Sequence, residues 1–156
     1  MDDRALIQQQ LGSSHGFLKH TLNDVTEEEA QRIPSPAVSP IVWQVGHVAF
    51  VNFAFALGPD AARKRLPDAY ARLFATGTGG RADYPAFGEI AKALDDSHGA
   101  LLAAVAEADL STPNEGPVGA WKNFAEMYAF SNSHCWYHIG KISTLRAMLG
   151  KPRLFG

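Results

Sequence analysis

The sequence has little cysteine, little net charge and no long apolar run. Cys135 is the only cysteine among 156 residues, which excludes an internal disulfide framework and fits a reducing compartment. The formal net charge of -2 gives no electrostatic reason to expect a nucleic acid or an anionic membrane as a partner. No apolar run is long enough to span a bilayer, and residues 1–4 do not resemble a signal peptide. We therefore expect a cytoplasmic protein with neither partner.

Strand patterns are lacking as well, whereas helical periodicity recurs along the chain. A hydrophobic content of 46 % and a charged content of 19 % are ordinary for a globular protein, and 1–156 suits a single domain. Apolar spacing and end signals predict long helices from Asp2 or Asp3 to Asn23, from Ile41 to Leu57, from Asp83 to Asp109 and from Ala120 to Leu149. We expect an all-α protein, a four-helix bundle.

The second long helix has no charged residue between Ile41 and Leu57. We expect Ser39 to cap it, with Pro40 at the first helical position, and Gly58 to end it. A helix of this kind is buried on most sides. Either a second copy of the chain covers its outer face, which predicts a homodimer, or the remaining helices and the long connection cover it.

Two shorter segments carry their own signals. Thr26 to Glu29 forms a capping-box pattern that predicts a short helix. The pattern from Pro67 to Phe74 fits a helical turn or two within a long connection over residues 58–83. A connection of this length can return the chain along the bundle, which permits the second and third long helices to run parallel.

The last helical pattern places two histidines on a stripe that is apolar at both ends. The stripe contains Phe124, Met127, Ser131, His134, His138, Ile142, Leu145 and Leu149. Residues at i and i+4 share a helix face, so both imidazoles can point at one spot. A buried imidazole without a partner is costly, and a divalent metal would use both rings at once. The alternative is that a backbone carbonyl, a serine or a tyrosine satisfies each ring.

Other histidines provide further candidate ligands. His47 lies in the middle of an apolar face of the second long helix. His98 lies on the stripe of the third long helix and His15 beside that of the first, which makes both reserve ligands. A structural metal site would recruit one of them as a fourth ligand, whereas a catalytic site would leave a position open. His20 is expected at the surface.

Motifs in the second and in the last long helix resemble those of the DinB-like superfamily. The second helix reads Trp43-Gln44-Val45-Gly46-His47, and the last helix reads His134-x-x-x-His138-x-Gly140-Lys141-Ile142, followed by Leu145-Arg146-x-x-Leu149-Gly150-Lys151-Pro152. The resemblance covers essentially the whole chain. It implies a four-helix bundle of up-down-down-up topology whose metal ligands are His47, His134 and His138. The segment from Ser39 to His47 is also similar to the N-terminal domain of ergothioneine-synthesising sulfoxide synthases.

The resemblance also implies a chemistry. Neutral imidazoles suit Zn or Ni, with Fe(II) as a further candidate. Relatives of this kind include S-transferases that use low-molecular-weight thiols, a thiol-dependent maleylpyruvate isomerase, and hydrolases. The resemblance slightly favours a thiol-dependent S-transferase that acts on a small molecule. A metal-dependent hydrolase and a non-catalytic metal-binding bundle are the alternatives.

Four observations concern the residues around the expected ligands. Lys141 stands where the family has glutamine, and its charge would weaken cation binding if it pointed inward. Ser131 lies one turn before His134 and could bond a ligand or a water molecule. Cys135 is expected to be a small buried hydrophobe rather than a nucleophile. Most of the neighbouring aromatic side chains are expected in the core, with a minority touching substrate: Trp43, Phe50, Trp136 and Tyr137.

Overall fold

The regular structure of the protein is helical. The computed structural model describes residues 2–58, 61–62, 64, 68–79, 83–114 and 121–154. Its helices are α1 (Asp3–Leu22), α2 (Glu27–Gln31), α3 (Ile41–Leu57), α5 (Asp68–Phe74), α6 (Phe87–Glu107) and α7 (Phe124–Met148). Across these ranges there is no strand, only an isolated β-bridge between Pro113 and Asn123. The prediction of an all-α protein is confirmed.

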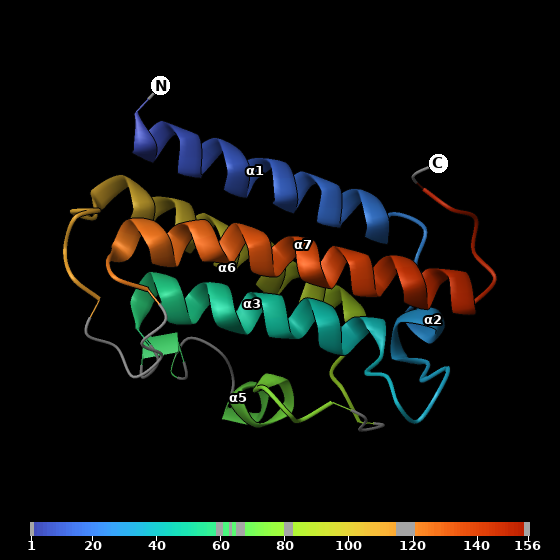
Figure 1. Ribbon diagram of the computed structural model, residues 1–156. Helices are drawn as coiled ribbons and strands as arrows, with labels where there is room; N and C mark the ends of the chain where they lie inside the picture. Colours follow the sequence, from blue (N-terminus) through green and yellow to red (C-terminus); the bar gives the residue numbers. More distant parts are fainter. Residues whose placement is uncertain are drawn as a thin grey trace.

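The long helices α1, α3, α6 and α7 lie side by side (Figure 1). α3 packs mainly against α6 and α7, whereas α1 packs mainly against α7. Followed by colour in Figure 1, α1 and α7 run in one direction and α3 and α6 run in the opposite direction. The connection between α3 and α6 therefore returns along the bundle, and α5 lies on this return path.

The N-terminal helices begin at side-chain caps. The Asp2 carboxylate accepts a hydrogen bond from the backbone N–H of Ala5 at 2.7 Å, which caps α1. The predicted capping box is present at α2, where Thr26 and Glu29 each accept a hydrogen bond from the other's backbone N–H.

The other helix ends differ from the predictions by a few residues. The prediction of Ser39 as the cap of α3 is wrong: Pro40 is the extended cap residue, and its carbonyl accepts the first helical bond from the N–H of Gln44 at 3.1 Å. α6 begins later than predicted, at Phe87, whose N–H donates to Glu27 at 2.8 Å. α7 begins after Asn123, which caps it. Ala120, its predicted start, lies outside the described residues.

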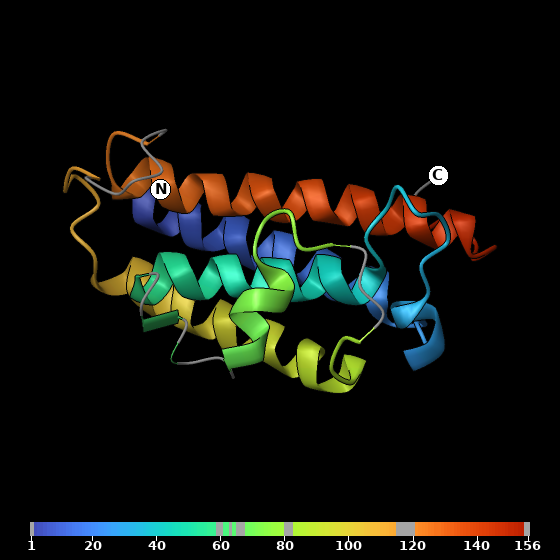
Figure 2. The ribbon, with the colours of Figure 1, turned by 90° about the horizontal axis from the view of Figure 1, so that it is seen from below.

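Most of α3 is covered within a single chain. Every residue from Ile41 to Ala49 is buried. α5 lies across α3 on the side away from α1 (Figures 1 and 2). The ring of Phe74 at the end of α5 is fully buried, and a Cβ atom added to Gly46 would lie 2.4 Å from its Cε1 atom. Glycine at position 46 therefore lets α5 approach the backbone of α3. Association of two copies through α3 stays a prediction.

The apolar character of α3 does not make it a membrane span. In the described parts of the chain, no helix combines the length and the hydropathy that crossing a bilayer requires.

A buried arginine joins the end of α1 to α7. The Arg146 side chain is only 2 % exposed. Its guanidinium donates to the carbonyl oxygen of Thr21 at 2.9 Å and pairs with the Asp24 carboxylate. The neighbouring guanidinium holds the pKa of Asp24 below its ordinary value. This contact fixes the position of α1 along α7.

Candidate metal centre

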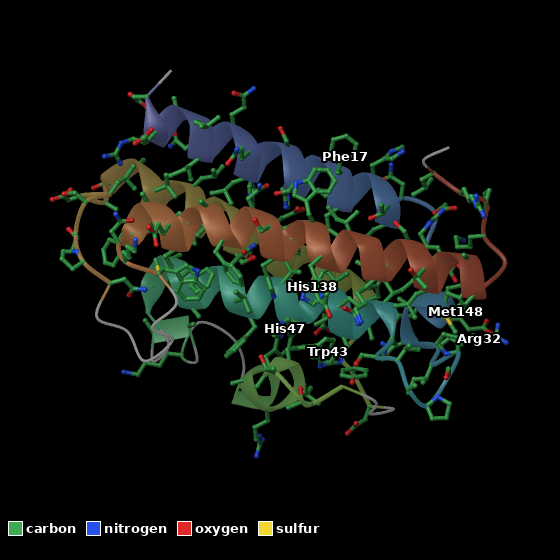
Figure 3. The ribbon with its side chains drawn as sticks, in the orientation of Figure 1. Phe17, Arg32, Trp43, His47, His138 and Met148 are labelled. Carbon is green, nitrogen blue, oxygen red and sulfur yellow. The ribbon has the colours of Figure 1, made fainter. Side chains whose placement is uncertain are left out.

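The structure brings His47, His134 and His138 together between α3 and α7. One nitrogen of each ring lies within 4.8 Å of the others, and the group has the composition and spacing to hold a metal ion. The closest pair is Nε2 of His134 and Nε2 of His138, 3.1 Å apart. The ring centroid of His47 lies 5.1 Å from each of the other two. Figure 3 shows His47 from α3 beside His138 from α7.

Gln44 determines which nitrogen of His138 faces the group. Nδ1 of His138 lies 2.7 Å from Oε1 of Gln44. The amide nitrogen of Gln44 donates to the carbonyl oxygen of Ser39 at 3.2 Å, which places its oxygen toward the imidazole. An amide oxygen only accepts, so Nδ1 of His138 carries the proton. The lone pair of Nε2 is then directed at the other histidines.

A backbone carbonyl determines which nitrogen of His47 faces the group. Nδ1 of His47 lies 2.7 Å from the carbonyl oxygen of Phe74. Since this oxygen can only accept, Nδ1 of His47 is the protonated nitrogen and Nε2 holds the lone pair. Metal-binding histidines in proteins are commonly oriented by acceptors of this type. α5 therefore contributes a backbone group to the candidate metal centre.

The surroundings of His134 also bear on whether these residues can hold a metal ion. His134 is half-buried, and its Nδ1 atom has no hydrogen-bond partner among the described residues. If Nδ1 of His134 carried the proton, it would be a buried donor without a partner. The Nε2 lone pairs of His134 and His138 would then face each other across 3.1 Å. A proton on Nε2 would leave Nδ1 as an unpaired acceptor. A cation shared by the Nε2 atoms removes the repulsion between lone pairs, so the donor set fits a divalent metal.

Burial keeps the three imidazoles neutral. It lowers the pKa of His138 to about 3, with smaller contributions from His134, His47 and Lys141. Burial, followed by the charge of His47, lowers the pKa of His134 to about 4. The pKa of His47 is also lowered by burial, against the opposing bond to Phe74. Neutral imidazoles have the free lone pairs that a metal ion requires.

The histidines lie at one wall of a large pocket. Its volume is about 940 Å³, within the range of small-molecule sites. α3 and α7 form two of its walls, and residues 37–39 and 76–79 contribute the rest. The Trp43 ring stacks on the ring of His47 with centroids 4.8 Å apart, and its indole N–H donates to Thr78 at 3.1 Å. Tyr137, which is 59 % exposed, also lines the pocket.

Lys141 lines the same pocket from α7. It is exposed, and its Nζ atom lies 5.3 Å from the centroid of the Tyr137 ring. The side chain therefore stays solvated, with its charge at the pocket.

The reserve ligands lie elsewhere. His15 and His98 stack on each other with ring centroids 3.9 Å apart, between α1 and α6. Nε2 of His15 lies 3.1 Å from the carboxylate of Asp95. Neither ring belongs to the group of His47, His134 and His138. His20 is exposed, as predicted.

The remaining predicted residues have structural partners. Ser131 is buried, and its hydroxyl donates to Oδ1 of Asn52 at 3.0 Å. Cys135 is 6 % exposed, and burial raises the pKa of its thiol to about 11, which agrees with a small hydrophobe. Trp136 packs against Phe17 of α1, away from the pocket lining, but it is 40 % exposed and so does not lie in the core as expected.

Sequence reasoning missed the roles of Gln44 and Phe74. Gln44 did carry a signal, because it is a polar residue three positions before His47 in a helix without charges. Phe74 acts through its backbone carbonyl, so its side chain gave no signal.

Comparison with protein families identifies a relationship. The model of the DinB superfamily matches residues 13–142, a span that contains all three histidines. None of the curated proteins compared with the chain matches it. The closer similarity to sulfoxide synthase domains stays a prediction.

Proposed function

The chain belongs to the DinB superfamily, and we propose that it is an enzyme that depends on a divalent metal ion held by His47, His134 and His138. One observation carries the proposal. The acceptors Gln44 and Phe74 fix the tautomers of two histidines, so that their free lone pairs face the third. Nitrogen donors of this kind suit Zn or Ni, with Fe(II) as a further candidate.

The surroundings support a catalytic rather than a structural metal. A structural site is closed by a fourth protein ligand, whereas a catalytic site keeps a position for substrate. Among the described residues, the group contains three histidines and no additional cysteine, aspartate or glutamate. The two reserve histidines, His15 and His98, are stacked on each other elsewhere. The group also borders a pocket that a small molecule can enter.

The pocket chemistry favours thiol transfer over hydrolysis. A bound divalent metal would lower the pKa of a thiol or of a water molecule. Hydrolysis is additionally assisted by a general base or acid, which in metal-dependent hydrolases is often a carboxylate. No aspartate or glutamate is among the described residues that line the pocket. A thiolate needs no such group, so we propose a thiol-dependent S-transferase that uses a low-molecular-weight thiol.

The transfer step places simple demands on the chain. The thiolate sulfur forms a bond to an electrophilic carbon of the second substrate, whose leaving group departs with the bonding electron pair. The thiol proton passes to solvent through the open side of the pocket. Trp43 and Tyr137 provide aromatic surface for the organic parts of both substrates.

Metal content tests the first part of the proposal. We would measure it by inductively coupled plasma mass spectrometry on untagged wild-type protein, on His138→Ala and on the control His98→Ala. We expect near-stoichiometric metal in the wild type and the control, and almost none in His138→Ala. Absence of metal from the wild type, even after incubation with Zn, Ni and Fe(II), would overturn the proposal.

Thiol chemistry tests the second part. Zn-loaded and Ni-loaded protein would be assayed for S-alkylation of small thiols by a fluorogenic electrophile and for hydrolysis of an activated ester. We expect S-alkylation that is lost in His138→Ala and kept in His98→Ala. Ester hydrolysis without thiol transfer would replace the transferase assignment with a hydrolase. Metal binding without either activity would identify a non-catalytic metal-binding bundle.

A further inference from the structure

The charge distribution of the pocket is one-sided. Seventeen described residues line it. The three histidines are neutral, so Lys141 is the only one of these residues that carries a charge at neutral pH. None of these residues is an aspartate or a glutamate. The other lining side chains are apolar, aromatic or uncharged polar groups, including the hydroxyl groups of Ser39, Thr76 and Thr144. A metal cation on the histidines would add further positive charge.

The ammonium group of Lys141 is not neutralised by the described part of the protein. Three of the other described lysines pair with carboxylates, namely Lys19 with Asp95, Lys92 with Asp96 and Lys151 with Glu29, whereas Lys64 and Lys122 have no such pair among the described residues. Lys141 has no such pair in the described ranges, and its Nζ atom lies over the face of the Tyr137 ring, 5.3 Å from the centroid. A ring face attracts the cation and positions it without removing its charge. Lys141 is therefore available to an anionic ligand.

We infer that Lys141 binds an anionic group, a carboxylate, of the small-molecule thiol while the sulfur of that thiol occupies the metal position. This inference rests on the proposed function and names its substrate class: a thiol acid rather than a neutral thiol. Lys141 is then a specificity-determining residue at the position where the family has glutamine.

The spacing on α7 matches a compact ligand with two functional groups. His138 and Lys141 are three residues apart, which is a rise of about 4.5 Å along the helix axis. Both residues line the same pocket. A ligand whose sulfur and carboxylate are separated by a short carbon chain can reach both positions. The hydroxyl groups of Ser39 and Thr76 add hydrogen-bond donors for the second carboxylate oxygen, whereas that of Thr144 already donates to the carbonyl oxygen of Gly140.

Matched ligands isolate the contribution of the carboxylate. Isothermal titration calorimetry on the Zn-loaded protein would compare mercaptopropionate with mercaptopropionamide, which has the same shape without the charge. The variants are Lys141→Gln, Lys141→Arg and the control Lys92→Gln, each checked for equal zinc content. We expect the wild type to bind the acid roughly threefold to tenfold more tightly than the amide. Lys141→Gln should reduce this preference, whereas Lys141→Arg and Lys92→Gln should keep it in full.

Ionic strength provides a second readout. An attraction between an exposed ammonium and a carboxylate weakens as salt screens it. The preference for the acid should therefore shrink in high salt for the wild type. A preference that is insensitive to salt, or that is undiminished in Lys141→Gln, would overturn the inference.

A second ligand pair separates this inference from the proposed thiol chemistry. Succinic acid monohydroxamate, and its amide in which a carboxamide replaces the carboxylate, bind metal ions without a sulfur atom. If they show the preference that depends on Lys141 while neither thiol binds, the anion site stands and the thiol route is wrong. If acid and amide bind equally in both pairs, the anion site is wrong and the metal site stands. If no ligand of either pair binds, both are wrong.

Discussion

Nδ1 of His138 and Oε1 of Gln44 lie 2.7 Å apart, although 94 positions separate the two residues in the chain. The contact joins α7 to α3 and orients a candidate ligand with an uncharged acceptor. Because Gln44 is itself held by the carbonyl oxygen of Ser39, the orientation of the imidazole depends on how α3 begins. Metal affinity is therefore expected to respond to changes in residues that hydrogen-bond to the histidines without binding the metal themselves.

The first prediction concerns Gln44→Met. Methionine has a similar volume but its thioether accepts a hydrogen bond from Nδ1 only weakly, so the tautomer of His138 is no longer fixed. We expect zinc affinity to fall about tenfold to a hundredfold, measured by competition with a chromophoric chelator. The same change at exposed Gln9 should leave the affinity unaltered. Equal affinities in Gln44→Met and the wild type would show that Gln44 does not orient the ligand.

The second prediction concerns Gly46→Ala. The new methyl group would lie 2.4 to 2.6 Å from three carbon atoms of the Phe74 ring, so the ring must move. We expect a loss of about 1–3 kcal/mol in the free energy of unfolding, together with weaker zinc binding, because the carbonyl of Phe74 holds His47. Thermal unfolding followed by circular dichroism and the chelator assay would measure the two effects.

Gly99→Ala is the matched control for this change. Gly99 lies within α6, and a Cβ atom there meets nothing within 4 Å. Alanine should stabilise the protein by about 0.5–1 kcal/mol through its helix propensity and should leave zinc binding unchanged. If Gly46→Ala behaved like this control, the close approach of α5 to α3 would be unimportant for the site.

The third prediction concerns the effect of Lys141 on the metal itself. The ammonium charge is one of the causes that lower the pKa of His138, so it also opposes a cation at that ring. Lys141→Gln should bind zinc about twofold to fivefold more tightly at low salt, and Lys92→Gln should match the wild type. A weaker affinity in Lys141→Gln would mean that the lysine supports the site instead.

The fourth prediction concerns stability in acid. Burial, reinforced by the charge of His15 and opposed by Asp95, lowers the pKa of His98 from 6.5 to about 4. The unfolded chain therefore binds more protons than the folded chain between these values, and stability is lost as pH falls through this window. For metal-free protein, His98→Gln should reduce this loss by about 1–2 kcal/mol, allowing for partial exposure.

Urea unfolding at several pH values, with a chelator present, would measure this effect. The chelator is needed because a bound metal ion would compete with protons at His47, His134 and His138. His20→Gln is the control, since His20 is exposed on α1, and it should keep the slope of the wild type. A slope in His98→Gln that equals the wild-type slope would contradict the prediction.

The long helices were predictable because their signals are local. Periodicity and caps such as Asp2 and Thr26 act within a few residues, and the structure has a helix at each predicted segment. Helix ends were less predictable where a distant contact decides them. The N–H of Phe87 donates to Glu27, 60 positions away, and no local signal reports such a bond.

The candidate site was predictable only in part. The spacing of His134 and His138 places both rings on one face of a helix, and the family motif added His47. The acceptors that orient them were not predicted, because they depend on long-range packing. His98 shows the same limit: it lies on the apolar stripe of the third long helix, yet Ser97 is the fully buried residue of the two and His98 stacks on His15. Neighbouring positions on a helix differ by about 100°, and packing chooses between them.

The position of α5 in a connection has a consequence for how the pocket can vary. α5 belongs to the connection between α3 and α6, yet it contributes the carbonyl that orients His47, and the residues just after it form one wall of the pocket. Connections accept substitutions and changes of length more readily than the core of a bundle. Changes to this segment can therefore reshape the pocket while the helices that carry the histidines stay as they are.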